Sequence, residues 1–396
     1  MKTRTLALVL SLGVGTLAAG AFAQAPPSTS LPAPGTPTAD APQSPEVLPD
    51  RRVTFRLKAA KAEKVTIAGE WTRPNAQPNT PEPMRKDAAG IWTITVGPLE
   101  PNVYIYVFDV DGMTIADPVN PQVKLRARAS ASMVEVPGDN PWEMRDVPHG
   151  TMSIETHVSK IVNGPRQVVV YTPAGYVGAA SKTRYPVLYL LHGTNDLAVG
   201  WTMAGRANLI FDNLIADKRA TPMIIVMPWG HALPFGAKPG PNEPTNNDLF
   251  ERYLLEEVSP MIEGKYAVAR GRANHAIAGL SMGGAQAMQI VLGHRDKFSA
   301  LAVFGAGMNR ADYEARFGDK MRGRPASEAL SVVYFGIGKE DSGLPRARDL
   351  EARLAEQGLP VTYHEIDGGH TYPVWRALLS DAAPRFFVPT NKARSH

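Results

Sequence analysis

The chain of 396 residues contains no cysteine. This absence excludes a disulfide-stabilised scaffold, a thiolate zinc site, an iron–sulfur cluster, a cysteine nucleophile and a lipid anchor on an N-terminal cysteine. Any covalent catalyst must therefore be a serine, a threonine, a lysine or a carboxylate.

The chain also has little excess charge of either sign. The 42 Lys and Arg residues against 38 Asp and Glu give +4, and removal of Lys2 and Arg4 with the N-terminal segment discussed next leaves +2. So small an excess does not provide a nucleic-acid-binding surface, and we expect no nucleic-acid partner. A hydrophobic fraction of 44% indicates well-formed cores, and the length suits two domains.

Long apolar runs are missing except near the N-terminus. Basic residues within Met1–Arg4 precede an apolar stretch from Leu6 to Ala19, and small residues continue to Ala25. This order is that of a secretory signal peptide cleaved after Ala23 or Ala25, and a membrane anchor is the alternative. Because the stretch is short for a helix that must span ~30 Å, we expect a signal peptide at residues 1–25 and a secreted or periplasmic protein without membrane contact.

Residues 26–50 are rich in proline, with eight prolines among Ser, Thr, Ala and Gln. Such a segment buries little apolar surface and is expected to be an extended, disordered linker.

Residues 51–145 contain short β-type runs separated by turn residues. The runs are Val53–Leu57, Lys64–Ala68, Ile91–Val96, Val103–Val110 and Ser132–Val136. Several short strands at this spacing predict a small all-β sandwich. The run Val103–Val110 is apolar on both faces, which favours a central sandwich strand, with an aromatic ligand platform as the alternative.

Residues 146–390 alternate apolar strands with amphipathic helices. The expected strands are Gln167–Tyr171, Val187–Leu191, Met223–Met227, His275–Leu280, Ala300–Phe304, Val332–Gly336 and Val361–Ile366, and the expected helices are Ala207–Arg219, Leu249–Tyr266, Gly283–Gly293 and Pro345–Gly358. This alternation predicts an α/β domain with a mostly parallel sheet covered by helices on both faces.

A G-x-S-x-G pattern lies between an expected strand and an expected helix. Residues 279–283 read Gly-Leu-Ser-Met-Gly, with Ser281 at the centre. In a strand–turn–helix context the sharp turn requires glycines and raises the serine above the sheet, and the helix N-terminus faces the oxyanion that acylation creates. We therefore predict Ser281 as a nucleophile; a Gly-Ser turn without chemistry is the alternative.

A serine nucleophile needs a base and a group that orients the base. In this fold class the acid and then the histidine follow the serine, each on a loop after a later strand. The run Val332–Gly336 leads to Glu340 and Asp341, and the run Val361–Ile366 leads to His370. We assign His370 as the base and Asp341 as the acid, with Glu340 as the competing acid and Asp367 as a loop residue.

The oxyanion should be bound by two backbone N–H groups. One is that of Met282, and the other comes from the loop after Val187–Leu191, at Gly193 or Thr194. His192 is expected to be a structural loop histidine.

Two other patterns resemble metal or phosphate motifs. His364-Glu365 and His370 are spaced H-E-x-x-x-x-H, which does not place both histidines on one helical face, and Gly336–Lys339 lacks the upstream glycine of a phosphate loop. We expect no catalytic metal and no cofactor.

The segment Trp229–Asn246 is rich in glycine and proline and long for a loop inside a domain. Such loops are frequently functional, so we expect it to shape a substrate cleft with Phe235 as a wall; a surface excursion without a role is the alternative.

These motifs together resemble the esterase branch of the α/β-hydrolases that contains feruloyl and acetyl-xylan esterases of carbohydrate esterase family one and the enterobactin-type esterases. The likeness rests on Tyr189–Gly193 with Trp201, on Ala276–Gly284, and on Gly368–Thr371 with Trp375. The upstream part resembles an early-set carbohydrate-binding domain through Val65–Trp71, Gly90–Trp92 and Asp117–Asn120.

The resemblance implies an exported serine carboxylesterase that acts on hydroxycinnamoyl or acetyl esters of plant cell-wall polysaccharide. It also makes Trp201 and Trp375 candidate substrate contacts. Three alternatives stay open: an esterase for siderophore or other aromatic esters, an acyltransferase on the same residues, and an inert carbohydrate-binding protein.

Overall fold

The computed structural model describes residues 41–71, 78–319 and 329–388. The expected signal peptide and residues 26–40 of the expected linker lie outside these ranges. Within them, no helix combines the length and the apolar character that crossing a bilayer requires.

Two antiparallel sheets form the predicted sandwich. Their strands are β1 (Glu46–Val47), β2 (Val53–Lys58), β3 (Val65–Gly69), β4 (Glu82–Pro83), β5 (Arg85–Lys86), β6 (Ile91–Val96), β7 (Asn102–Val110), β8 (Met113–Ile115), β9 (Val123–Lys124) and β10 (Ala131–Val136). One sheet has the order β1-β2-β6-β5 and the other β4-β3-β7-β10-β9, with β8 paired to β7. The apolar core between the sheets includes Phe55, Trp71 and Trp92.

The sandwich begins earlier than the sequence suggested. β1 lies inside the segment expected to be linker and pairs with β2, and the Ser44 hydroxyl donates to the Asp117 carboxylate at 2.6 Å. The last residues of the proline-rich segment are therefore ordered, because strand pairing and a buried hydrogen bond hold them.

β7 is buried on both faces, which confirms the interpretation as a central strand. Tyr104, Tyr106 and Phe108 face the sandwich core, whereas Val103 and Ile105 belong to a core shared with helices of the α/β region. The aromatic side chains are at most 6% exposed, so they do not form a platform for a ligand.

The α/β region contains one eight-stranded sheet. Its strands are β11 (Thr151–Ser159), β12 (Gly164–Thr172), β13 (Val187–Leu191), β14 (Ile224–Pro228), β15 (His275–Leu280), β16 (Ala300–Phe304), β17 (Val332–Gly338) and β18 (Val361–Ile366). The order is β11-β12-β14-β13-β15-β16-β17-β18. Strands β13 to β18 run parallel to one another, and β12 pairs antiparallel with both β11 and β14. This is the predicted mostly parallel α/β sheet.

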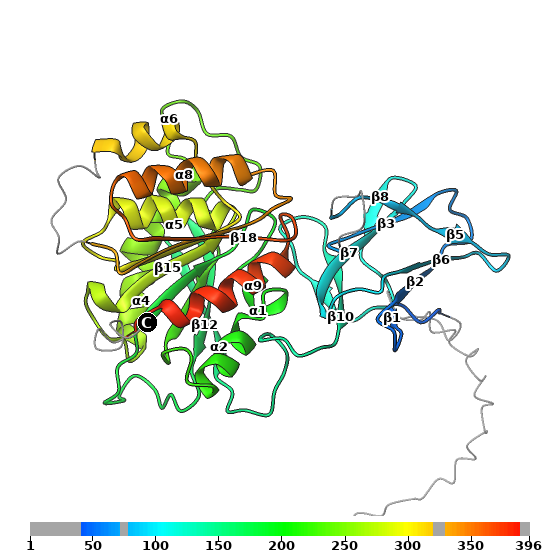
Figure 1. The fold of residues 1–396 in the computed structure, drawn as a ribbon, viewed down its shortest axis with the longest axis horizontal. Helices are drawn as coiled ribbons and strands as arrows, with labels where there is room; N and C mark the ends of the chain where they lie inside the picture. The colour runs from blue at the N-terminus through cyan, green and yellow to red at the C-terminus, as the bar shows by residue number, and fades with distance from the viewer. Residues whose placement is uncertain (1–40, 72–77, 320–328, 389–396) are drawn as a thin grey trace, which may run out of the picture. The chain divides into compact units, whose positions relative to one another are not determined.

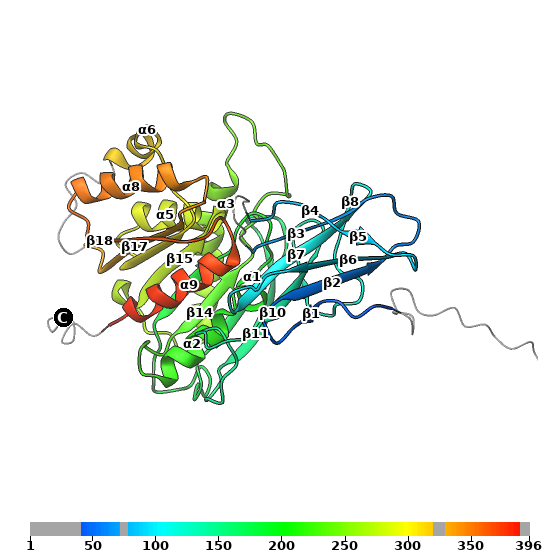
Figure 2. The same cartoon turned by 45° about the vertical axis from the view of Figure 1, so that its right-hand side comes forward.

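Helices cover both faces of this sheet (Figures 1 and 2). They are α1 (Gly200–Met203), α2 (Ala207–Ala216), α3 (Asn246–Arg252), α4 (Ser259–Lys265), α5 (Met282–Gly293), α6 (Arg310–Tyr313), α8 (Leu344–Glu356) and α9 (Tyr372–Ala382), with a π-helical segment, Tyr253–Val258, joining α3 to α4. Residues of α1, α2 and α9 pack on one face, and residues of α3, α4, α5 and α8 pack on the other. The sandwich and the α/β region form one compact unit.

Candidate active site

Ser281 occupies a strained turn between the last residue of β15 and the first residue of α5. Its φ of 51° and ψ of −116° lie in a region that L-residues rarely adopt. A Cβ on Gly279 would lie 2.3 Å from the Gly283 carbonyl oxygen, and one on Gly283 would lie 2.5 Å from the Leu191 oxygen. The two glycines of the motif are therefore required, because strand, turn and helix approach so closely here.

The structure brings together the three side chains predicted from chain order. His370 Nε2 lies 2.9 Å from Ser281 Oγ, and His370 Nδ1 lies 2.6 Å from Asp341 Oδ2. The Asp341 carboxylate fixes the tautomer by accepting from Nδ1–H, which leaves Nε2 free to accept the serine proton. The Asp341 side chain is 4% exposed and that of His370 is 43% exposed, so the acid is shielded while the base faces solvent.

The geometry distinguishes the two candidate acids. Asp341 accepts the backbone N–H of Gly343 at 2.8 Å with its other oxygen and points inward. Glu340 is exposed and accepts the backbone N–H of Gly368, while Asp367 pairs with Lys339 at 2.6 Å. Glu340 thus supports the loop that carries His370 without touching the imidazole.

The imidazole of His370 lies against Trp375, with ring centroids 4.9 Å apart and the planes nearly perpendicular. Trp375 is 6% exposed and lines the cavity described below. Gly305, with a φ of 59°, leaves space for the side chains of Trp375, Asp341 and His370. A Cβ there would lie 2.6 Å from the indole nitrogen and 3.3 Å from both Asp341 Oδ2 and His370 Nδ1.

The loop after β13 lies beside Ser281, as expected for a donor to an oxyanion. A Cβ on Gly193 would lie 2.6 Å from Leu280 Cδ1 and 3.4 Å from the Ser281 Cβ, so the backbone of this loop passes close to the turn that carries Ser281. The Gly193 N–H contacts Asp196 at 3.4 Å. In the described part of the chain the Thr194 N–H has no acceptor, and the Met282 N–H lies in the first turn of α5, where helix N–H groups are free. The geometry therefore favours Thr194 over Gly193 as the partner of Met282.

Two buried histidines hold this loop in place. His192 Nε2 accepts the Gly230 N–H at 2.8 Å, which puts its proton on Nδ1, and Nδ1 donates to the Gly193 oxygen at 2.8 Å. His231 Nε2 donates to the Thr194 oxygen at 2.7 Å. Burial lowers the pKa of His192 to about 4 and also lowers the pKa of His231, so both rings are neutral hydrogen-bonding groups.

Two of the candidate substrate contacts lie elsewhere. Trp201 is fully buried, donates to the Leu191 oxygen at 2.9 Å and packs edge-on to Phe304 and Tyr372, so it is a core residue and its assignment to the substrate was wrong. Phe235 is half-buried between His231 and the Arg128 guanidinium and does not line the cavity. The buried part of the Trp229–Asn246 loop lies behind the loop after β13, here called the oxyanion loop (His192–Asp196), where Gly230 donates to His192.

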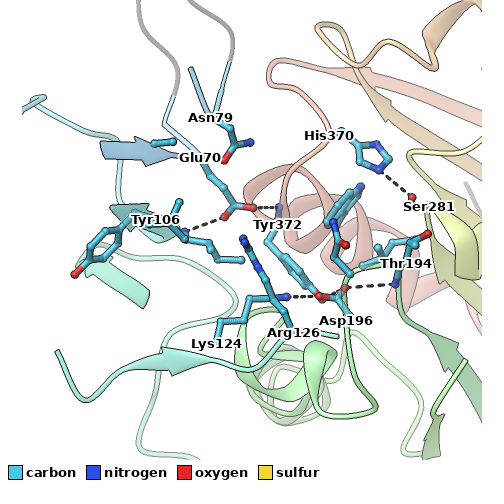
Figure 3. A pocket seen from close by; sticks show the side chains of 17 residues that line it. Glu70, Asn79, Tyr106, Lys124, Arg126, Thr194, Asp196, Ser281, His370 and Tyr372 are labelled. Carbon is cyan, nitrogen blue, oxygen red and sulfur yellow. Dashed lines mark hydrogen bonds and ion pairs between the residues drawn. The ribbon is translucent and has the colours of Figure 1, made fainter. Parts of the chain in front are cut away.

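A cavity of about 360 Å³ opens beside Ser281 and His370 (Figure 3). One side consists of the α/β region, with Thr194, Ser281 and Trp375. The other side consists of the sandwich, whose contribution is Ala68, Glu70, Asn79, Ile105, Tyr106, Val107, Lys124 and Arg126. The sandwich is thus a wall of the candidate active site, which the sequence analysis did not predict.

Comparison with known proteins agrees with this geometry. Residues 159–386, more than half of the chain, match the family described as "Putative esterase". The chain belongs to this esterase family.

The chain is similar to proteins of two kinds. It is 29% identical over 341 residues to an endo-1,4-beta-xylanase/feruloyl esterase of Xylanibacter ruminicola, a match that covers 84% of this chain and 44% of that relative. A solved ferulic acid esterase is 27% identical, with a TM-score of 0.52, and covers 60% of this chain and 97% of its own. The enterobactin esterase of Shigella flexneri, 17% identical with a TM-score of 0.62, covers 85% of this chain and 92% of its own, and shows a shared fold.

Buried charges connect the sandwich to two loops of the candidate site, the loop after β13 and the loop that carries His370. Lys124 of β9 pairs with Asp196, which also accepts the Tyr372 hydroxyl at 2.8 Å and contacts the Gly193 N–H. Both partners of the pair are at most 6% exposed. Burial lowers the pKa of Lys124, and the Asp196 carboxylate opposes this. A sandwich lysine therefore fixes the residue that anchors the oxyanion loop.

Glu70 makes a second connection, to the loop that carries His370. One of its oxygens accepts the N–H of Tyr372, the first residue of α9, at 3.0 Å, and the other accepts the Ile105 N–H at 3.0 Å. Burial raises the pKa of this carboxyl, and the N–H of Tyr372 opposes the shift. A carboxylate at the N-terminal end of α9 also complements the helix dipole. Glu70 therefore caps the helix that begins two residues after the candidate base, His370.

Among the described residues, no group of three or more His, Asp or Glu side chains is placed to hold a metal ion. His364 lies on β18, stacked on Tyr334 with ring centroids 5.4 Å apart, and not on a helix of the zinc-binding type.

The residues that sequence reasoning missed are Glu70, Lys124, Arg126, Asp196, His231 and Gly305. Asp196 and Gly305 each follow a strand that was predicted, so their place at the carboxyl edge of the sheet was a usable signal. The sandwich residues had none, because their contacts depend on how two distant segments pack.

Proposed function

We propose that this chain is an exported serine carboxylesterase that hydrolyses hydroxycinnamoyl or acetyl esters of plant cell-wall polysaccharide through an acyl-enzyme intermediate. The observation that carries the chemistry is the hydrogen-bonded series Ser281–His370–Asp341 at the wall of an open cavity.

In the first half-reaction, Ser281 Oγ attacks the ester carbonyl carbon while His370 Nε2 takes the serine proton. The carbonyl oxygen becomes an oxyanion and accepts from the N–H groups of Met282 and Thr194. Asp341 stabilises the imidazolium. The bond from carbon to the alcohol oxygen then breaks, and the alcohol leaves with the proton from His370.

In the second half-reaction, a water molecule takes the place of the alcohol. His370 accepts a proton from the water as its oxygen attacks the acyl carbon, and the bond to Ser281 Oγ then breaks. The serine recovers the proton from His370, and the carboxylic acid is released. The exposure of His370 supports this step, because water must reach Nε2.

The relatives support the proposed substrates. A relative named for feruloyl esterase activity aligns with 84% of the chain, a span that includes sandwich residues as well as the α/β region. A hydroxycinnamoyl group is flat and aromatic, and Trp375 offers an indole beside the imidazole for it to contact. The N-terminal sequence supports export.

The experiment is turnover of 4-nitrophenyl acetate, methyl ferulate and acetylated xylan by the purified protein and by Ser281→Ala. We expect kcat to fall by a factor on the order of 10⁶ in the variant. Equal turnover by the variant would refute Ser281 as the nucleophile, and activity on acetate but not on ferulate esters would refute the hydroxycinnamoyl assignment.

N-terminal sequencing of protein recovered outside the cytoplasm tests export, which predicts a chain that begins at Gln24 or Pro26.

A further inference from the structure

The cavity beside Ser281 is lined by several charged side chains, and most of them have an ion-pair or hydrogen-bond partner within the protein. Lys124 and Asp196 form a buried pair with each other. Both oxygens of Glu70 accept backbone N–H groups. Within the part of the chain that the structure describes, the lining charge without such a partner is the guanidinium of Arg126.

Arg126 lies in the connection between β9 and β10 and is half-buried. In the described residues, no carboxylate pairs with its guanidinium and no carbonyl accepts from it. Figure 3 shows its side chain among the lining residues on the sandwich side, with Ser281 and His370 on the other side. Arg126 is also close enough to Lys124 to add, after burial, to the lowering of the Lys124 pKa. Lys124 is already paired with Asp196, so among the described lining residues Arg126 is the cation left without a carboxylate partner.

A half-buried guanidinium without a carboxylate partner is held at a cost that a bound anion removes. The planar guanidinium donates two parallel N–H groups, which match the two oxygens of a carboxylate. Asn79, on the same wall, adds a neutral amide. One guanidinium and one amide fit a singly charged carboxylate, whereas a phosphate dianion is usually bound by several cations or by a series of backbone N–H groups.

We propose that Arg126 makes the esterase selective for esters that carry a carboxylate on the acid or the alcohol part. The proposal rests on the proposed function, since the ester itself must be held at Ser281. On the alcohol side such a group is the carboxylate of an acidic sugar, and on the acyl side it is the free carboxylate of a half-esterified dicarboxylic acid.

Two matched substrate pairs test the proposal and separate the two sides. On the acyl side, mono-4-nitrophenyl glutarate is compared with 4-nitrophenyl pentanoate. On the alcohol side, the feruloyl ester of methyl galacturonoside is compared with that of methyl galactoside. For each pair the measured quantity is the ratio of kcat/KM for the anionic over the neutral ester, in the wild type, in Arg126→Gln and in Arg126→Lys.

We expect Arg126→Gln to lower this ratio by about tenfold to a hundredfold in at least one pair, because a charge-assisted, two-point hydrogen bond is lost. Arg126→Lys should retain part of the preference, and added salt should reduce it in the wild type. Arg128→Gln is the matched control, since it removes an exposed arginine two residues away and should leave both ratios as in the wild type. The side on which the ratio falls identifies the part of the substrate that carries the carboxylate.

Ratios that stay unchanged in Arg126→Gln for both pairs would overturn the proposal, as would an equal fall in Arg128→Gln, which would indicate only long-range attraction. Binding of monomethyl glutarate to Ser281→Ala, with and without Arg126→Gln, measured by titration calorimetry, gives a readout that needs no turnover. Failure of the wild type to hydrolyse any ester would refute the proposed function. Equal affinity of Ser281→Ala and Ser281→Ala/Arg126→Gln for monomethyl glutarate would refute the carboxylate subsite.

Discussion

Asp341 and Glu340 are neighbours in the chain, yet only Asp341 touches the imidazole of His370. We expect Asp341→Asn to lower kcat by a factor on the order of 10⁴, because an amide N–H toward Nδ1 would favour the wrong tautomer. Glu340→Gln should cost less than about tenfold, since its role is to accept a backbone N–H from Gly368. Kinetics on 4-nitrophenyl acetate check this, and a larger loss in Glu340→Gln would contradict the assignment of the acid.

His192 should make stability depend on pH. Its pKa in the folded protein, about 4, lies below its ordinary value of 6.5 because burial disfavours the imidazolium. Between these values the unfolded chain binds the extra proton, so stability present above pH 6.5 is lost as the pH falls toward 4, by up to roughly 3 kcal/mol.

Urea denaturation at a series of pH values tests this effect of His192. The variant His192→Asn should be less stable than the wild type at pH 7, but its free energy of unfolding should fall less between pH 6.5 and 4. Parallel curves for the two proteins would show that His192 is not the group responsible.

At the scale of single elements, the oxyanion loop depends on the buried pair between Lys124 and Asp196. Lys124→Met leaves the carboxylate buried without its cation, which should lower the free energy of unfolding by about 3–5 kcal/mol. We also expect kcat to fall at least about tenfold with a smaller change in KM, since the loop that Asp196 anchors would shift from the oxyanion.

Lys265→Met is the matched control for this variant. Lys265 pairs with Glu155 at 2.6 Å, but its side chain is 51% exposed, so the cost should stay within about 1 kcal/mol. The double variant Lys124→Met/Asp196→Asn should regain most of the lost stability. A Lys124→Met protein with wild-type stability and kcat would contradict the role given to the pair.

The elements themselves were largely predictable from local patterns. The strands Val187–Leu191 and His275–Leu280 have the predicted bounds, because short runs of aliphatic residues end at turn residues. β11 was missed because it is an edge strand in which a few apolar residues lie among polar ones. Its apolar residues Met152, Ile154 and Val158 are exposed, so it has no continuous apolar run. α9 was missed too, because it begins only two residues after His370 and starts with Tyr-Pro, a pair that also occurs in loops.

The candidate site was predictable only where chain order and turn chemistry specify it. Ser281, Asp341 and His370 follow strands in the expected order, and the structure brings them within hydrogen-bond distance. Trp201 was assigned wrongly because local sequence does not tell whether a tryptophan faces a cavity or a core. Lys124 and Asp196 are 72 positions apart, and no pattern in either segment reports the other.

At the scale of the whole molecule, the sandwich completes the site. Val103 and Ile105 belong to the same core as Trp375 and Leu378 of α9, and Arg376 of α9, fully buried, donates to Asn102 at 2.7 Å and to the Val103 oxygen. The sandwich therefore shields an apolar face of the α/β region as well as lining the cavity.

We expect a chain that begins at residue 146 to have a lower melting temperature and to lose activity on methyl ferulate and on feruloylated polysaccharide in equal proportion. Both losses follow because truncation removes Lys124, the partner of Asp196, and exposes the apolar surface of α9 that the sandwich covers. Undiminished activity on the soluble ester, with a loss only on polymer, would instead indicate a targeting module.

Covalent labelling tests whether Ser281 is a nucleophile activated by His370. The protein is treated with an active-site fluorophosphonate, and the adduct is located by peptide mass spectrometry. We expect one adduct, on Ser281, and we expect it to form far more slowly in His370→Ala. An adduct on another residue, or ester hydrolysis that continues after complete labelling of Ser281, would contradict this role of Ser281.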